Sequence, residues 1–188
     1  MDQASTPNSV WMALALDHAH RAAAQGEVPV GAVVVSRGQV ISVAHNQRER
    51  DADPLAHAEL LALRAAASLL GRWRLSEVEL YSTLEPCPMC AGASIAARVA
   101  KVVFGARDPK AGACGSVVDL FVPGQFNHCP EVVGGVLAED CGRVLREFFG
   151  ARRARSQSTR SRLGQGDQGW GALSMPHSER WPSPVEGV

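Results

Sequence analysis

Hydrophobic positions follow a helical spacing in several stretches of this chain. After residue 9 apolar side chains such as Trp11 and Leu14 recur at that spacing, and Gly26 ends the run. A second run, rich in alanine and leucine, lies between Asp53-Pro54 and Gly71, which are typical helix boundaries. The pattern predicts helices over residues 9–25, 57–70, 91–98 and 138–153.

Short runs of β-branched residues separate these helices and predict strands. The first two runs flank Ser36-Arg37-Gly38-Gln39, a segment typical of a hairpin turn. Strands that alternate with helices after an opening hairpin favour an α/β sheet covered on both faces. The expected strands are residues 28–35, 40–44, 78–84 and 101–105, with one more in the Gly- and Pro-rich stretch 108–135.

Length and composition fit one folded domain with a tail. The chain has 188 residues, 46% of them hydrophobic, and 19 basic side chains against 19 acidic ones. This balance allows a buried core and excludes both a disordered polyelectrolyte and a protein coated with positive charge. Ser, Gln, Gly, Arg and Pro dominate after Arg153. We therefore expect a folded domain at 1–153 and a disordered tail at 154–188, with docking of Trp170 and Trp181 as the alternative.

Neither a membrane helix nor a signal peptide is expected. No apolar run approaches the roughly 20 residues that a spanning helix needs, and residues 1–5 lack a basic start. We therefore expect a cytoplasmic protein that binds no membrane. Of the five cysteines, Cys87 and Cys90 form a close pair. In a reducing compartment such a pair indicates metal or redox chemistry rather than a disulfide framework.

Two motifs at predicted helix starts carry the candidate chemistry. His57-Ala58-Glu59 opens the second helix, and Cys87 and Cys90 open the third. One imidazole and two thiolates suit a tetrahedral Zn²⁺ whose fourth position is left to water, as in catalytic zinc sites. Glu59 is near enough to move protons without binding the metal. The residues therefore predict zinc-dependent hydrolysis.

Cys87 and Cys90 considered alone allow two other interpretations. They could form a redox pair or half of a structural zinc knuckle. A structural site would require a fourth protein ligand, and the presence of His57 and Glu59 in the expected order favours catalytic zinc.

Several longer segments narrow the substrate class. They are Glu27-Val28-Pro29-Val30-Gly31-Ala32, Asn46, Asp53-Pro54, Ala56-His57-Ala58-Glu59, Thr83-Leu84-Glu85-Pro86-Cys87-Pro88-Met89-Cys90-Ala91-Gly92-Ala93 and Phe104-Gly105-Ala106-Arg107-Asp108-Pro109-Lys110-Ala111-Gly112-Ala113. They contain the H-x-E and P-C-x-x-C signature of zinc nucleobase deaminases. Together they closely resemble the bacterial tRNA-specific adenosine deaminases, from about Trp11 to about Arg153.

The resemblance implies a fold, a reaction and a set of site residues. The fold would be the three-layer α/β/α cytidine-deaminase-like fold, with a central mixed sheet of about five strands. The reaction would be hydrolytic deamination of adenosine to inosine at the wobble position of an arginine tRNA anticodon, by zinc-activated water. The partners would be a tRNA anticodon stem-loop and a second copy of the chain. The resemblance assigns one zinc per subunit to His57, Cys87 and Cys90, proton transfer to Glu59, base contacts to Asn46 and the backbone of Ala58, ribose and backbone contacts to Asp108 and Lys110, and an extended RNA surface to Arg152 and Arg153.

Each RNA contact also has a simpler structural interpretation. Asn46 could end a strand, Asp108-Pro109 could be ordinary turn chemistry, and the arginines at 152–153 could form a solvated helix end. Two other functions share the zinc core: a deaminase of free guanine, cytosine or a nucleoside, and an inert zinc-stabilised RNA-binding module. The chain departs from the family pattern at Leu55, where Thr is common, at Cys114 and in the predicted tail.

Overall fold

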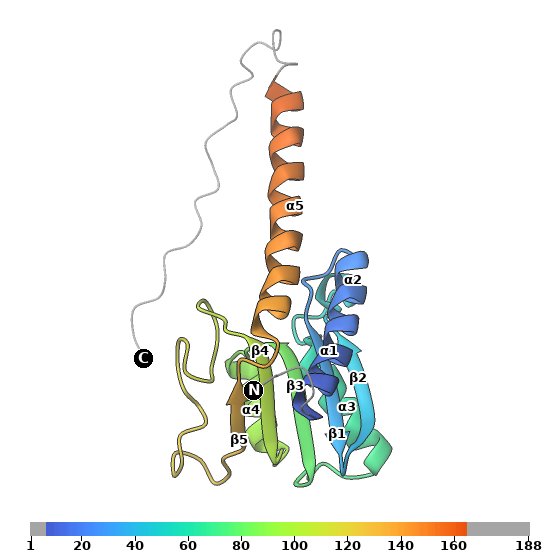
Figure 1. Ribbon diagram of the computed structural model, residues 1–188. Coiled ribbons are helices and arrows are strands. Elements are labelled where there is room, and N and C mark those ends of the chain that lie inside the picture. Colours follow the sequence, from blue (N-terminus) through green and yellow to red (C-terminus); the bar gives the residue numbers. More distant parts are fainter. Residues whose placement is uncertain (1–6, 165–188) are drawn as a thin grey trace, which may run out of the picture. The chain divides into compact units, whose positions relative to one another are not determined.

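Five strands form one sheet in this computed structural model, which describes residues 7–164 (Figure 1). Across the sheet they are β2 (Gln39–His45), β1 (Gly31–Ser36), β3 (Val78–Leu84), β4 (Lys101–Ala106) and β5 (Glu131–Gly134). Strand β1 is antiparallel to β2 and β3, whereas β3, β4 and β5 run parallel to one another. The sheet is therefore mixed.

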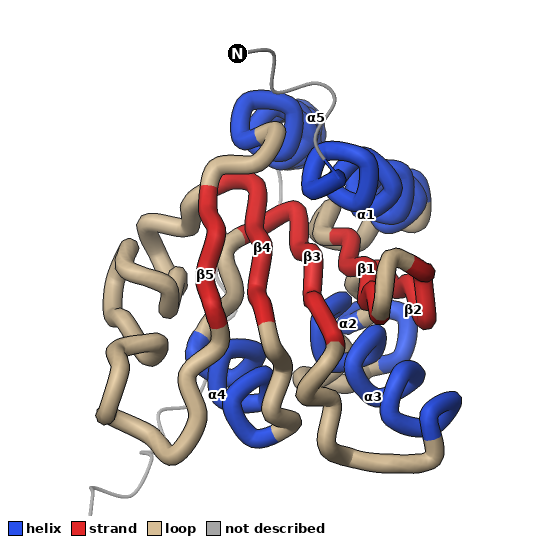
Figure 2. The backbone as a smooth tube through the Cα atoms, turned by 60° about the horizontal axis from the view of Figure 1, so that its bottom comes forward, coloured by secondary structure: helices blue, strands red, loops and turns tan. Residues whose placement is uncertain are grey.

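Helices cover both faces of this sheet (Figure 2). The helices of the described chain are α1 (Pro7–Ala24), α2 (Arg48–Asp51), α3 (Ala58–Leu70), α4 (Pro88–Ala96) and α5 (Ala138–Gly164). Helix α1 and the first turns of α5 pack on one face, and α3 and α4 pack on the other. The predicted three-layer α/β/α fold with a mixed five-stranded sheet is confirmed.

Strand β1 lies between the two helical layers and is buried along its whole length. Val33 and Val35 pack with Met12 of α1 on one face. Val34 packs with Ala62 of α3 on the other face. Because successive side chains of a strand point to opposite faces, both sets must be apolar. This explains the uninterrupted apolar run that predicted a strand here.

The opening hairpin begins later than the sequence predicts. The pattern predicts a strand from residue 28, but β1 starts only after Val30. Pro29 has no amide hydrogen to donate to a strand ladder, and Val28 and Val30 line the pocket described below. At the turn, Arg37 and Gly38 have φ angles of 50° and 73°. Two positive φ angles are typical of a two-residue type I′ turn.

Helix α5 continues past the predicted end of the domain. The chain divides into two compact units between Arg152 and Arg153, and the described residues of the second unit are helical up to Gly164. The structure thus has helix at residues 154–164, where the sequence analysis expects disorder, and 165–188 lie outside the described residues. No Pro or Gly interrupts 151–163, and its Ala, Arg, Gln and Leu favour helix. The division into a domain at 1–153 and a tail stays a prediction.

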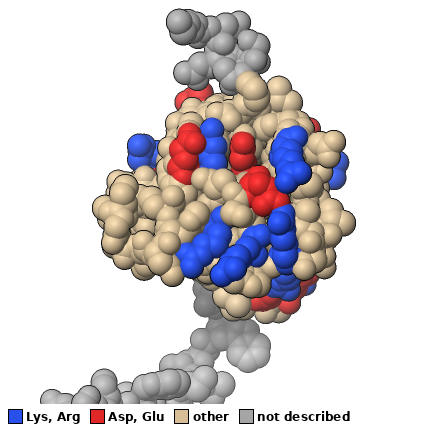
Figure 3. All heavy atoms as spheres, turned by 90° about the horizontal axis from the view of Figure 1, so that it is seen from below, with Lys and Arg blue, Asp and Glu red and all other residues tan. Residues whose placement is uncertain are grey.

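Basic and acidic side chains are mixed on the surface, as Figure 3 shows for one face. Ion pairs join Arg72 to Glu77 and Lys101 to Glu131. Exposed pairs of this kind contribute little to stability. Within residues 7–164 no helix is long and apolar enough to cross a membrane.

Candidate metal centre and substrate pocket

The candidate metal ligands lie at the starts of two helices. His57 is the N-cap of α3 and Cys87 is the N-cap of α4, both with extended backbone angles. Cys87 precedes Pro88, and a residue before proline is held extended. Pro88 in turn suits the first helical position, where no amide hydrogen is needed. The sequence therefore fixes where α4 begins, and Cys90 follows within its first turn.

The three donor atoms converge. His57 Nδ1 lies 3.5 Å from Cys90 Sγ and 3.7 Å from Cys87 Sγ, and the three atoms lie within 4.8 Å of one another. A tetrahedral zinc with ordinary bond lengths would hold nitrogen and sulfur donors about 3.6 Å apart. The residues thus fit a zinc ion that has one position left for water.

The two thiols do not titrate alike. Hydrogen bonds with Cys90 and His57 lower the pKa of Cys87 to about 4, against the opposing effect of burial. The pairing with Cys87, together with burial, raises the pKa of Cys90. One thiol therefore ionises readily, and the second keeps its proton until a cation compensates the charge. Positive potential at the N-terminus of α4 further favours thiolates.

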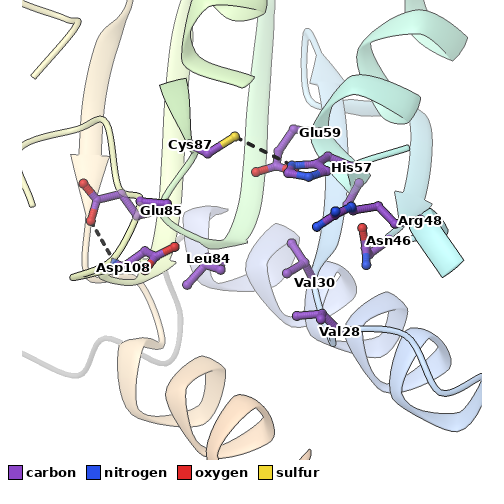
Figure 4. A pocket seen from close by; sticks show the side chains of 12 residues that line it. Val28, Val30, Asn46, Arg48, His57, Glu59, Leu84, Glu85, Cys87 and Asp108 are labelled. Carbon is purple, nitrogen blue, oxygen red and sulfur yellow. Dashed lines mark hydrogen bonds between the residues drawn. The ribbon is translucent and has the colours of Figure 1, made fainter. Parts of the chain in front are cut away.

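Glu59 lies in the first turn of α3, beside His57 (Figure 4). Only 4% of this residue is exposed, and its side chain lines the pocket. Burial raises the pKa of its carboxyl group. A buried carboxyl group beside a metal site is a candidate for proton transfer.

A small pocket opens in front of these groups. Its volume is about 140 Å³, close to the roughly 150 Å³ of an engineered cavity that binds benzene. A pocket of this volume suits one planar ring system. Among the residues predicted for the site, those that line it are Asn46, His57, Ala58, Glu59, Cys87 and Asp108.

Asn46 stands on the wall formed after β2 and is almost fully buried, with 5% exposed. Its Nδ2 donates to Glu27 Oε2 over 3.2 Å, and Glu27 Oε1 accepts the backbone N–H of Arg50 over 2.8 Å. Asn46 thus follows the last residue of its strand and also faces the pocket. Its position fits both the end of a strand and a contact with the base.

Asp108 lies on the opposite wall, in the loop after β4. Its Oδ1 accepts the backbone N–H of Lys110 over 2.9 Å, which is a local turn. Lys110 is exposed and is not among the residues that line the pocket. Arg152 and Arg153 are exposed on α5, where the Arg152 guanidinium lies 5.8 Å from the Phe148 ring centroid.

Sequence reasoning missed three polar residues in this region: Glu27, Arg48 and Glu85. Arg48 and Glu85 line the pocket, and Glu27 accepts a hydrogen bond from the Asn46 side chain. The available signal was a lone acidic residue at the edge of an apolar run, as Glu27 precedes Val28 and Glu85 follows Leu84. An acidic residue in such a place is seldom buried without partners.

Comparison with known proteins agrees with this geometry. Residues 5–106 match the family model of the cytidine and deoxycytidylate deaminase zinc-binding region. The chain belongs to this deaminase family. The matched region is the zinc-binding region of the family, so the expected cofactor is zinc. The His57, Cys87 and Cys90 donors are ligands that zinc prefers.

Individual members of this deaminase family are also similar. The tRNA-specific adenosine deaminase of Bacillus subtilis is 48% identical over 160 residues, which cover 85% of this chain and 99% of that protein. A solved structure from a study of A-to-I editing by tRNA:A34 deaminases at the wobble position has a TM-score of 0.70 and 41% identity, covering 72% of this chain and 99% of that one. The guanine deaminase of Nitrosomonas europaea has a TM-score of 0.67 and 28% identity, covering 74% and 83%.

Proposed function

We propose that this protein deaminates adenosine to inosine at the wobble position of a tRNA anticodon, that of an arginine tRNA in particular. The observation that carries the proposal is the convergence of His57, Cys87 and Cys90 beside Glu59 at a pocket the size of one heterocycle. The similarity to a tRNA-specific adenosine deaminase over 99% of that protein's length selects the substrate. The choice of the arginine tRNA rests on the resemblance alone.

In this proposal His57, Cys87 and Cys90 hold the zinc ion. Bound zinc supplies Lewis-acid chemistry, which lowers the pKa of water to near neutrality. Glu59 accepts a proton as water adds to adenine C6 and returns it to the departing amino group, so that ammonia leaves and inosine forms. Its burial keeps bulk water from competing for that proton.

Asn46 and the backbone of Ala58 hold the base in the pocket. The amide of Asn46 is fixed by Glu27, so its orientation is set before the substrate arrives. An adenine inside a stacked anticodon loop cannot reach this depth, and the nucleotide must swing out of the stack. Asp108 contacts the ribose, and the exposed Lys110 contacts the phosphate backbone.

Further RNA contacts come from Arg152 and Arg153, which are exposed on α5. Each arginine that contacts a phosphate should contribute to a salt-dependent affinity. Replacing both by alanine should weaken binding of the stem-loop and flatten its salt dependence. Equal affinity and equal salt slope would remove these residues from the RNA surface.

We also propose a cytoplasmic homodimer. An apolar groove between α3 and α4 supports the dimer, since Leu60, Ala67 and Ala93 line it beside Trp73, which is 57% exposed. Large exposed apolar patches commonly mark protein interfaces. Sedimentation at several protein concentrations tests the dimer, and a monomer at every concentration would contradict it.

The decisive experiment is Glu59→Gln, assayed for inosine formation on an anticodon stem-loop. Loss of a general acid and base should reduce turnover by about 100-fold to 10,000-fold, while the zinc content stays unchanged. Glu131→Gln is the matched control, because the Glu131 side chain is exposed on β5 and pairs with Lys101 at the surface. Wild-type protein that contains zinc and yields no inosine would refute the proposal.

A second candidate function is deamination of a free base or nucleoside. The similarity to a guanine deaminase and the small pocket favour it. Turnover of guanine, cytosine or a nucleoside without turnover of the stem-loop would select this function. An inert RNA-binding module would instead bind the stem-loop equally well as wild type and as the Glu59→Gln variant, and neither protein would turn over either substrate.

A further inference from the structure

Glu85 is a buried carboxylate that the proposed reaction does not use. It follows β3 directly, two residues before Cys87, and is 2% exposed. Although it borders the pocket, its carboxylate is directed toward the Asp108 loop and away from Glu59 (Figure 4). Burying a charged carboxylate is costly unless hydrogen bonds replace its hydration, so its partners explain its presence.

Every partner of this carboxylate lies in the loop that follows β4. Glu85 Oε2 accepts the backbone N–H of Asp108 over 3.0 Å and the hydroxyl of Ser116. Glu85 Oε1 accepts the backbone N–H groups of Cys114 and Ser116 over 2.9 and 3.1 Å. With two donors on each oxygen, the carboxylate is occupied and is a poor candidate for proton transfer to a substrate.

The loop packs directly against this carboxylate. A Cβ placed on Gly112 would lie 2.4 Å from Glu85 Cδ, closer than real side chains approach. The backbone N–H of Ala113 also donates to the carbonyl of Pro86 over 2.8 Å. The segment that carries Cys87 therefore also fixes the loop 108–116, and with it the pocket wall formed by Asp108.

We propose that Glu85 is a positioning residue for RNA recognition: it holds the Asp108–Ser116 loop in register with the metal centre, so that Asp108 and Lys110 meet the nucleotide whose base occupies the pocket. This proposal rests on the proposed function. Because the zinc donors and Glu59 belong to the starts of α3 and α4 and not to the loop, loosening the loop should weaken substrate binding more than it slows the chemical step.

The test is Glu85→Gln in the zinc-loaded full-length protein. The glutamine amide would turn a donor toward backbone donors and lose about half of the hydrogen bonds. We expect the KM for the anticodon stem-loop to rise about tenfold or more, with kcat within about threefold of wild type and zinc content unchanged. Amide exchange at Asp108, Cys114 and Ser116 should accelerate by about tenfold or more. Glu131→Gln, the same chemical change at an exposed position, should alter none of these quantities.

Ser116→Ala provides a graded variant, because it removes only the hydroxyl donor. Its KM should rise about twofold to fivefold, and it carries the test alone should Glu85→Gln fail to fold. An unchanged KM with unchanged amide exchange, or a loss confined to kcat, overturns the positioning role. A wild-type protein without stem-loop activity instead refutes the proposed function, and the amide exchange result then still decides whether Glu85 holds the loop.

Discussion

Among the glycines described, Gly31 has the least room for a side chain, because helix α1 packs directly against it. A Cβ at this position would lie 1.9 Å from the carbonyl oxygen of Ala15 and 2.6 Å from the backbone nitrogen of Ala19. Both neighbours are backbone atoms, so no side-chain rotation can relieve the overlap. In Gly31→Ala the helix would have to retreat by about 1.5 Å, which opens gaps beneath its buried face.

The expected cost is at the upper end of the range for overpacked cores, about 3 kcal/mol of unfolding free energy. For a chain of this size that loss lowers the melting temperature by roughly 6 to 12 °C. Chemical denaturation of the zinc-loaded protein measures this loss of unfolding free energy. The zinc loading and the protein concentration are kept the same for both proteins, because bound zinc and association both add apparent stability.

Gly92→Ala is the matched control. Gly92 lies inside α4, and a Cβ there would meet no atom within 4 Å apart from its chain neighbours and the backbone of its own helix. Alanine should stabilise the helix by about 0.5 to 1 kcal/mol. Should Gly31→Ala unfold within about 0.5 kcal/mol of wild type, the claim that α1 packs on the β1 backbone would be wrong.

Three further predictions concern the metal, a buried hydroxyl and acid stability. Removing zinc with a chelator should abolish inosine formation and lower the unfolding free energy by about 2.7 kcal/mol or more. This is the value expected for an ion present at a hundred times its dissociation constant. An activity and a melting temperature that survive verified metal removal would contradict the zinc centre. The Tyr81 hydroxyl lies 2.6 Å from Glu79 Oε2 and 3.0 Å from Asn8 Oδ1. Tyr81→Phe should therefore lower the unfolding free energy by about 1.5 kcal/mol in urea denaturation. A midpoint equal to that of wild type would count against these hydrogen bonds. Burial acts to raise the pKa of Glu85, but its hydrogen bonds prevail and lower it below the ordinary 4.5. Its charge therefore stabilises the fold above pH 4.5, and this contribution is lost as the pH falls below 4.5 and through the lowered pKa. The stability gap between wild type and Glu85→Gln should shrink over that fall in pH, and a constant gap would refute the assignment.

The elements with a buried face were predictable from the sequence. Strand β3 has the predicted bounds, Val78–Leu84, because its buried residues and its flanking turns mark both ends. Helix α2 (Arg48–Asp51) was not predicted, since it has four residues and none of them is buried. A hydrophobic pattern can report only those segments that contribute to the core.

The site was predictable where local spacing determines it. His57 and Cys87 are helix N-caps, Cys90 lies in the first turn of α4, and Pro88 marks the start of α4 in the sequence itself. The roles of Glu27 and Glu85 depend on contacts with loops 19 to 31 residues away. Only the folded chain brings these groups together, so the spacing of Glu27 and Glu85 in the sequence did not mark them as site residues.

The candidate metal donors come from segments that lie far apart in the sequence, since Cys87 follows His57 by 30 residues. An ion that binds where these segments meet binds the folded chain and not the unfolded one, so loading with metal is coupled to folding. Damage elsewhere in the fold that leaves much of the zinc-free protein unfolded then raises the free zinc concentration at which half the molecules are loaded. A core variant such as Gly31→Ala would consequently look like a metal-affinity mutant in zinc-poor cells, although it touches no ligand.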